Sequence, residues 1–236
     1  MTPSRLREAR SWWAREAYGR RDRQTALEAL ERSGIPRRSV ARAKGVFSAM
    51  ARGEALIAGA AGLAVPRPKN SMKNTRYLRL LQWRMVMAYG GFEIFAKACL
   101  GRSDTGGLHP EDIDHITACC GYEPPAIAPP VCSADAAKWL NRPQKGRPIQ
   151  ILIDFLQLKD GHGTFMEQWL TGTPITSAAG ACHLAKILRH ATAHGVLSPT
   201  KCRELGFVDA IRTTPRTLDA IRLTVIERIY GSRQPR

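Results

Sequence analysis

Residues 74–100 read NTRYLRLLQWRMVMAYGGFEIFAKACL. Their apolar side chains recur every three or four positions, which is the spacing of one face of an α-helix. The members of this stripe are Tyr77, Leu80, Leu81, Met85, Ala88, Phe92, Phe95 and Cys99. Gly101 follows the stripe, and glycine commonly ends a helix. A stripe of this length predicts one long helix that is packed along most of its course, and hence an all-α helical bundle.

The segments on both sides of this helix show the same spacing of apolar residues, and none of them forms an internal repeat. The expected helices cover residues 3–18, 25–33, 36–50, 110–120, 133–140, 148–158, 164–170, 176–194 and 214–230. The β-branched residues of 148–158 also fit a strand. Gly161-His162-Gly163 predicts a turn between two helices. Thr214 before Pro215 predicts the cap and first turn of the last helix, and the prolines of 121–132 predict an irregular connector.

Positive charge dominates the chain. It has 236 residues, a formal net charge of +16 and a pI of about 10.2. Such a surplus attracts anions, of which nucleic acid is the commonest partner and an anionic membrane surface the next, although it can also serve solubility alone. Residues 1–52 hold 13 Lys or Arg against five Asp or Glu. With the proline-containing break at residues 66–70, this predicts a basic helical N-terminal region, residues 1–65, before a helical bundle, residues 70–232.

The cysteines and the N-terminus indicate the compartment. The six cysteines form no CxxC pair, and the arginine-rich N-terminus lacks the apolar core of a signal peptide. These features predict reduced thiols in a cytoplasmic protein. The most apolar segment, residues 55–65, is too short to cross a bilayer, so no membrane partner is expected. His115, Cys119, Cys120 and Cys132 fit no standard zinc module, so we expect thiols without a metal, and no cofactor.

The segment Arg189-His190-Ala191-Thr192-Ala193-His194 ends an apolar helical stretch directly before Gly195. His190 and His194 are one turn apart on the same face, and the long side chain of Arg189 can bend toward them. An imidazole can take a proton from a ribose 2′-OH or give one to a leaving oxygen, and a guanidinium can stabilise the phosphate charge. An Arg followed by a His four to six places later is expected about twice by chance, but Arg-His-x-x-x-His only about 0.02 times. The tighter pattern therefore predicts cleavage of RNA phosphodiesters without a metal.

Residues 189–195 resemble the signature of HEPN domains, in which Arg, a polar residue and three variable residues precede a His that is often followed by Gly. Residues 74–100, with Gly91-Phe92-Glu93, are similar to the first bundle helix of such domains. The resemblance covers residues 70–232 and implies a homodimer in which two motifs face one cleft. It also implies a metal-independent endoribonuclease that leaves 2′,3′-cyclic phosphate ends. In that case Arg189 and His194 are catalytic, and His190 is the polar residue that orients them.

The resemblance further implies a toxin or an anti-phage effector that an inhibitory or activating protein partner controls. The toxins of this family that a nucleotidyltransferase silences carry a Tyr two residues after the motif His. Here that position is Val196, so control of that kind is not expected. Some HEPN domains bind without cutting, and the alternative is therefore a non-catalytic nucleic-acid-binding or adaptor protein. A peripheral membrane protein is a third hypothesis, which lacks a strongly amphipathic basic helix.

Other interpretations of these residues stay open. Cations at a helix C-terminus are favoured by the helix dipole without any catalytic role. His190 and His194, with His183 on the same face, could bind zinc, although no HExxH glutamate or nearby cysteine completes such a site. Glu93 either orients the catalytic pair or lies on a solvated face.

The N-terminal helix interleaves aromatic and basic side chains. Trp12 and Trp13 either stack on bases or dock the helix on the core, and we expect docking. Some of the surrounding arginines are expected to contact RNA phosphates. The candidates are Arg10, Arg15, Arg20, Arg21 and Arg23.

Overall fold

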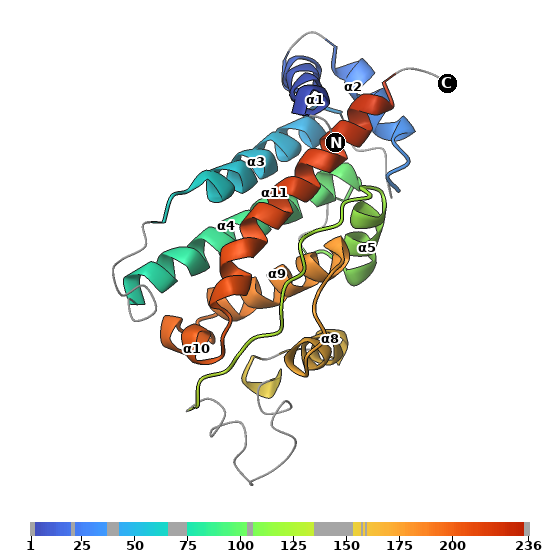
Figure 1. The fold of residues 1–236 in the computed structure, drawn as a ribbon. Coiled ribbons are helices and arrows are strands. Elements are labelled where there is room, and N and C mark those ends of the chain that lie inside the picture. Colours follow the sequence, from blue (N-terminus) through green and yellow to red (C-terminus); the bar gives the residue numbers. More distant parts are fainter. Residues whose placement is uncertain are drawn as a thin grey trace. The chain divides into compact units, whose positions relative to one another are not determined.

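The computed structural model describes residues 3–19, 22–36, 43–65, 75–102, 106–134, 153–156, 158 and 160–233. Its helices in chain order are α1 (Pro3–Glu16), α2 (Arg23–Arg32), α3 (Ala43–Gly62), α4 (Thr75–Cys99), α5 (Pro110–Ala118), α8 (Asp160–Leu170), α9 (Ala178–Ala193), α10 (Pro199–Glu204) and α11 (Val208–Gly231) (Figure 1). Among these residues the only β-type pairing is one isolated antiparallel bridge between Ile127 and Ile175. The predicted all-α class is confirmed.

Close contacts group the chain into two compact units. The first unit comprises Met1–Gly59, Gly90–Tyr122 and Leu218–Arg236, and the second comprises Ala60–Tyr89 and Glu123–Thr217. Helices α3, α4 and α11 each contribute residues to both units. The division into residues 1–65 and 70–232 that the sequence suggests stays a prediction.

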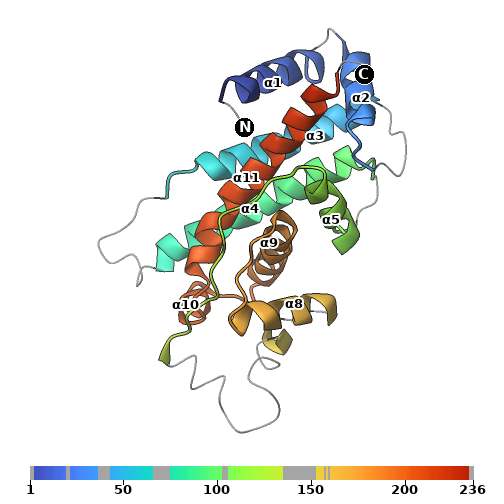
Figure 2. The same cartoon turned by 45° about the vertical axis from the view of Figure 1, so that its right-hand side comes forward.

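In the first unit, α1 and α2 lie side by side (Figures 1 and 2). Trp12 is 7% and Trp13 only 1% exposed, and the indole of Trp13 meets the ring of Phe47 edge-on, with the centroids 5.8 Å apart. The tryptophans therefore dock α1 on the core, as predicted. The carboxylate of Asp22 caps α2 by accepting from the N–H of Thr25 at 3.0 Å, so this helix begins earlier than its apolar pattern suggests.

Also in the first unit, α3 and α4 cross at a pair of glycines. A Cβ atom added to Gly53 would lie 2.6 Å from the carbonyl oxygen of Gly91, and one added to Gly91 would lie 2.7 Å from the carbonyl oxygen of Gly53. Only hydrogen fits at either position, because real Cβ atoms do not approach backbone atoms so closely. The two glycines therefore set how closely these helices pack.

The second unit is built around α9. Ser177 caps the start of α9 by accepting from the N–H of Gly180 at 3.0 Å, as predicted. The apolar side of the helix is buried with residues from α4, α8, α10 and α11 in one core. The rings of Trp169 and Phe207, 5.5 Å apart, belong to this core. These contacts hold α9 along its whole length.

The predicted irregular connector is confirmed and is attached to the second unit over residues 123–134. The backbones of Ile127 and Ile175 exchange hydrogen bonds of 2.8 and 3.0 Å. The indole N–H of Trp169 donates to the carbonyl of Ala128 at 3.1 Å. These bonds pair the backbone groups of Ile127 and the carbonyl of Ala128, and they attach the segment without regular secondary structure of its own.

Two predictions about breaks in the helices were wrong. Gly161-His162-Gly163 is not a turn but lies in the first part of α8. The weak helix preference of these glycines is outweighed by packing, because Gly163 is buried and an added Cβ there would touch Ile153 at 3.4 Å. Of the other predicted helices in this region, 133–140 and the start of 148–158 fall largely outside the described residues, and residues 153–155 are helical rather than extended.

The predicted start of the last helix at Thr214-Pro215 was also wrong, because Pro215 lies inside α11. Proline removes one helical N–H and crowds the turn before it. In this turn the hydroxyl of Thr214 donates to the carbonyl of Ala210, and that of Thr213 donates to the carbonyl of Asp209 at 2.9 Å. These bonds end on the carbonyls of Ala210 and Asp209, whereas Pro215 withholds its N–H from the carbonyl of Ile211. The helix continues through this turn because Ile211 and Thr214 are buried. The short helix α10 before it was not predicted.

Candidate active site

The motif of residues 189–194 occupies the end of α9. Residues 189–190 lie within the helix, and His194 is its C-terminal cap, with φ −86° and ψ 5°. Gly195 follows at φ +73°, in the left-handed region that glycine adopts without strain. The N–H of Leu197 then returns to the carbonyl of Ala191 at 2.8 Å. The helix thus ends where the motif ends, as the sequence predicts.

The two motif histidines lie against each other. The ring centroids of His190 and His194 are 4.4 Å apart and the rings are tilted by 50°. His194 is exposed, whereas His190 is half-buried. The structure therefore places two imidazoles side by side, with one open to solvent, and confirms the predicted shared face.

Arg189 starts from a different side of the helix. Five residues of an α-helix turn through about 500°, so the side chains of Arg189 and His194 leave the axis about 140° apart. The guanidinium Nε of Arg189 is buried and has no hydrogen-bond partner among the described residues. A buried donor in this state costs about 1–3 kcal/mol. The Arg189 side chain therefore carries a buried donor without a partner among the described residues.

A row of basic side chains continues from the motif toward the start of α9. His183, Lys186, His190 and His194 follow one another at intervals of three or four residues, which places them on one helix face. His162 of α8 joins this row, with its ring centroid 6.3 Å from that of His183. Burial, together with the nearby charges of Lys186, His183 and His190, lowers the pKa of His162 to about 4.

Sequence reasoning missed the contribution of His162. The helical spacing of His183 and Lys186 with the motif was visible in the sequence, but His162 comes from another helix, and the segment around it was expected to be a turn. Its approach to the row follows from the packing of α8 beside α9, which no local pattern reveals.

Helix α4 fixes the loop that follows the motif. The buried side-chain amide of Gln82 donates to the carbonyl of Leu197 at 2.7 Å. Leu188 and Ala191 of α9 are fully buried in the same core as Met85 of α4. The end of α9 is therefore held between a packed helix face and a fixed loop, as a site that must keep its geometry requires.

The arginines proposed to contact RNA lie in the first unit, or outside the described residues. Arg10 and Arg15 are exposed on α1, and Arg15 donates to the hydroxyl of Ser11 at 3.1 Å. Arg23 is half-buried at the start of α2 and its Nε is buried without a partner among the described residues. Arg20 and Arg21 lie outside the described residues. Contact of this set with RNA stays a prediction.

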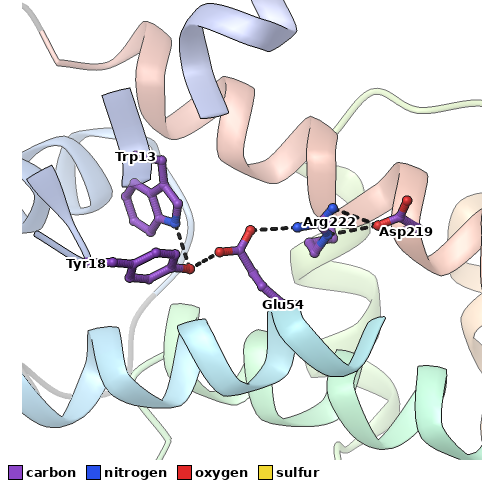
Figure 3. A network of polar contacts seen from close by, with 5 residues as sticks. All are labelled: Trp13, Tyr18, Glu54, Asp219 and Arg222. Atoms are coloured by element: carbon purple, nitrogen blue, oxygen red, sulfur yellow. Dashed lines mark hydrogen bonds and ion pairs between the residues drawn. The ribbon is translucent and has the colours of Figure 1, made fainter. Parts of the chain in front are cut away.

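A second polar cluster lies in the first unit (Figure 3). The buried carboxylate of Glu54 accepts from the hydroxyl of Tyr18 and, at 2.8 Å, from the guanidinium of Arg222. Arg222 also donates to Asp219 at 2.7 and 3.0 Å, and the indole N–H of Trp13 donates to the oxygen of Tyr18 at 2.9 Å. Burial and the Glu54 carboxylate raise the pKa of Tyr18. Because every group has its partner within the cluster, we interpret it as part of the core.

The other candidate residues point to no further site. Within the described ranges, no three or more His, Cys, Asp or Glu side chains are placed to hold a metal ion together, which leaves the zinc interpretation of the motif without support there. Burial raises the pKa of the Cys120 and Cys202 thiols to about 12. The carboxylate of Glu93 pairs with Lys97 at 3.6 Å. No helix in the described part of the chain has the length and apolarity needed to cross a membrane.

Comparisons with protein-family models, with curated proteins and with solved structures give no match for this chain. The HEPN resemblance of residues 189–195 therefore stays a prediction.

Proposed function

We propose that this chain is a metal-independent endoribonuclease of HEPN type, with its active site at the end of α9. The observation that carries the proposal is the pair of imidazoles, 4.4 Å apart, of which His194 is open to solvent. Two adjacent imidazoles suit a reaction in which one proton leaves the nucleophile and another reaches the leaving group.

In the proposed reaction, His194 takes the proton of a ribose 2′-OH. The 2′ oxygen attacks the adjacent phosphorus, and the bond from phosphorus to the 5′ oxygen of the next nucleotide breaks. A proton delivered by an imidazolium at the site neutralises that leaving oxygen. The products are a 2′,3′-cyclic phosphate and a 5′-hydroxyl end, and no oxidant or other reactant is consumed. His190 orients His194, and a guanidinium stabilises the charge that develops on the phosphate oxygens.

The proposed guanidinium is that of Arg189, supplied by a second copy of the chain. Within one copy, helix geometry directs Arg189 and His194 to different sides of α9. A homodimer that brings two motifs to one cleft, as in the resembling family, would place the Arg189 of each copy beside the His194 of the other. The biological setting that goes with this proposal is a toxin or anti-phage effector under the control of a partner protein.

The experiment is a cleavage assay on single-stranded RNA in the presence of EDTA. The wild-type protein is compared with Arg189→Ala, His194→Ala and, as a matched histidine control, His115→Ala, which alters an exposed side chain of α5. We expect wild type and His115→Ala to produce cyclic phosphate ends from RNA and no product from DNA. Arg189→Ala and His194→Ala should lose at least about 100-fold in rate.

Two results would contradict the proposal. If the wild-type protein binds RNA without cutting it, and the motif variants behave identically, the chain is the non-catalytic nucleic-acid-binding protein instead. If cutting persists at the wild-type rate in His194→Ala, the nuclease site lies elsewhere. Circular dichroism of every variant separates loss of chemistry from loss of folding.

A further inference from the structure

Helix α4 begins in a segment without acidic residues. Residues 55–92 contain six Lys or Arg and no Asp or Glu. Arg76 and Arg79, in the first turns of α4, are exposed. Arg84 is buried instead, and its guanidinium donates to the carbonyls of Ala60 and Ala61 at 2.7 and 3.2 Å. The exposed first turns of this helix therefore offer positive charge, and the acidic residue of the helix, Glu93, lies in its other half, where it pairs with Lys97.

The same part of α4 exposes large apolar side chains. Leu80, Trp83 and Met87 are 40%, 54% and 40% exposed, and their spacing places them on one face of the helix. Arg76 and Arg79 fall within the same arc of about 100°. The opposite face is buried in the core of the second unit through Leu78, Leu81 and Met85, so the helix cannot turn to hide these side chains.

We propose that this α4 face, formed by Arg76, Arg79, Leu80, Trp83 and Met87, binds a single-stranded nucleic acid. The indole of Trp83 offers a flat apolar surface on which one base can stack, flanked by the methylene groups of its neighbours. The two guanidinium groups, one to two turns away, can hold phosphates on the adjoining nucleotides. An apolar partner alone would gain nothing from these arginines, whereas a strand of bases and phosphates uses both kinds of side chain.

The helix that carries the α4 face is hydrogen-bonded to the loop that follows the candidate active site. Gln82, next to Trp83 in the chain, bonds to the carbonyl of Leu197, which is three residues beyond His194. Three residues of extended chain span at most about 11 Å. The middle of α4 therefore lies near the end of α9, toward which the proposed strand would run. That this strand is the substrate of the α9 site rests on the proposed function, but its binding to the α4 face does not.

An anionic membrane is the other partner that basic and apolar residues together can suit. Membrane-surface helices insert a broad apolar face several ångström deep. Here three side chains, each about half covered, form a narrow stripe on a helix whose other face is buried. One exposed indole between arginines fits a single base better than an acyl layer.

The test compares two fluorescent deoxyoligonucleotides that carry the same phosphates, one with thymine bases and one abasic. Neither has a 2′-OH, so neither can be cut by the proposed reaction. Fluorescence anisotropy measures their binding to wild type, Trp83→Ala, Trp83→Phe, Arg79→Ala and Val131→Ala, the last a control that alters an exposed apolar residue of the connector. We expect wild type and Val131→Ala to prefer the oligonucleotide with bases by about ten-fold.

Each variant has its own expected signature. Trp83→Ala should lose the preference for bases, and Trp83→Phe should keep part of it. Arg79→Ala should weaken both ligands equally and lower the salt dependence by about 0.7 of a unit in the log–log slope. Equal binding of both oligonucleotides by wild type, or an unchanged preference in Trp83→Ala, overturns the proposal.

Two further measurements identify a different occupant. If Trp83→Ala loses binding to phosphatidylserine vesicles while oligonucleotide binding is unchanged, the face is a membrane surface. If only the oligomeric state changes, the face binds a second copy, and either result overturns the proposal. Because neither oligonucleotide can be cut, binding to the α4 face is measured independently of the proposed cleavage. If the protein cleaves RNA but binds both oligonucleotides equally, only the inference about the α4 face is overturned. If it prefers the oligonucleotide with bases but does not cleave RNA, only the proposed nuclease is overturned.

Discussion

At the scale of single residues, Glu54 and Arg222 form a buried ion pair. Their side chains are 11% and 5% exposed and meet at 2.8 Å. Removing Arg222 leaves the buried Glu54 carboxylate with only the hydroxyl of Tyr18 as a partner among the described residues, whereas removing both side chains leaves neither charge of the pair. We expect Arg222→Met to lower the free energy of unfolding by about 3 kcal/mol, and the double variant Glu54→Met with Arg222→Met to lose less. Urea unfolding measures both.

The control for this prediction is Arg52→Met, which alters an exposed residue of α3. Its free energy of unfolding should stay within about 0.5 kcal/mol of wild type. An equal loss in Arg52→Met and Arg222→Met would show that the burial of the pair has no special cost.

The pKa of His162 makes a prediction about pH. Burial, together with the nearby charges, lowers it from 6.5 to about 4 in the folded chain. Between these values the unfolded chain binds more protons, so the free energy of unfolding rises with pH across that window and falls on acidification. We expect wild type to lose about 1 kcal/mol more than His162→Gln between pH 6.5 and about 4. Solvent screening of the half-exposed ring keeps this below the full linkage value.

Chemical unfolding at several pH values measures this difference. His115→Gln serves as the exposed control and should follow the wild-type curve. Parallel curves for wild type and His162→Gln would mean that the ring titrates alike in the folded and unfolded chain.

At the scale of elements, the crossing of α3 and α4 predicts opposite effects of substitution at two adjacent glycines. A Cβ added to Gly91 would lie 2.7 Å from the carbonyl oxygen of Gly53, whereas one added to Gly90 would meet nothing within 4 Å. We expect Gly91→Ala to lower the free energy of unfolding by about 2 kcal/mol, because the helices must move apart. Gly90→Ala should raise it by up to about 1 kcal/mol through helix preference. Melting temperatures that shift in the same direction would contradict this.

The ends and faces of the long helices could be predicted from the sequence. In α4 the apolar stripe and the following Gly101 indicated both the helix and its end, and in α9 Ser177 and Gly195 did the same. Local rules failed at Gly161-His162-Gly163 and at Pro215, where breakers of helices lie inside them. In both places tertiary packing outweighs the local preference, and it cannot be deduced from one segment alone.

Part of the candidate site could likewise be predicted from the sequence, and part could not. The contact of His190 with His194 could be predicted because a helix brings residues four apart together. The approach of His162 and the partnerless Nε of Arg189 could not, because both depend on what other elements place around α9.

At the scale of the whole molecule, the proposed dimer can be tested by complementation between two inactive variants. If each site combines Arg189 of one copy with His194 of the other, a mixed dimer of Arg189→Ala and His194→Ala retains one complete pair. We expect a mixture of the two inactive variants, after exchange of subunits, to recover about a quarter of the wild-type rate. The quarter follows from half of the dimers being mixed, each with one of two sites. No recovery would place both groups in one copy.

The pairing of Glu54 with Arg222 also has a consequence for the synthesis of the protein. The two residues are 168 positions apart, and the first unit takes its last segment from Leu218–Arg236. At translation speeds of about 5–20 residues per second, the ribosome needs roughly 10 to 30 seconds to make the chain between them. During that time the nascent chain carries Glu54 without its guanidinium. The first unit can therefore complete its folding only after the segment that contains Arg222 has left the exit tunnel.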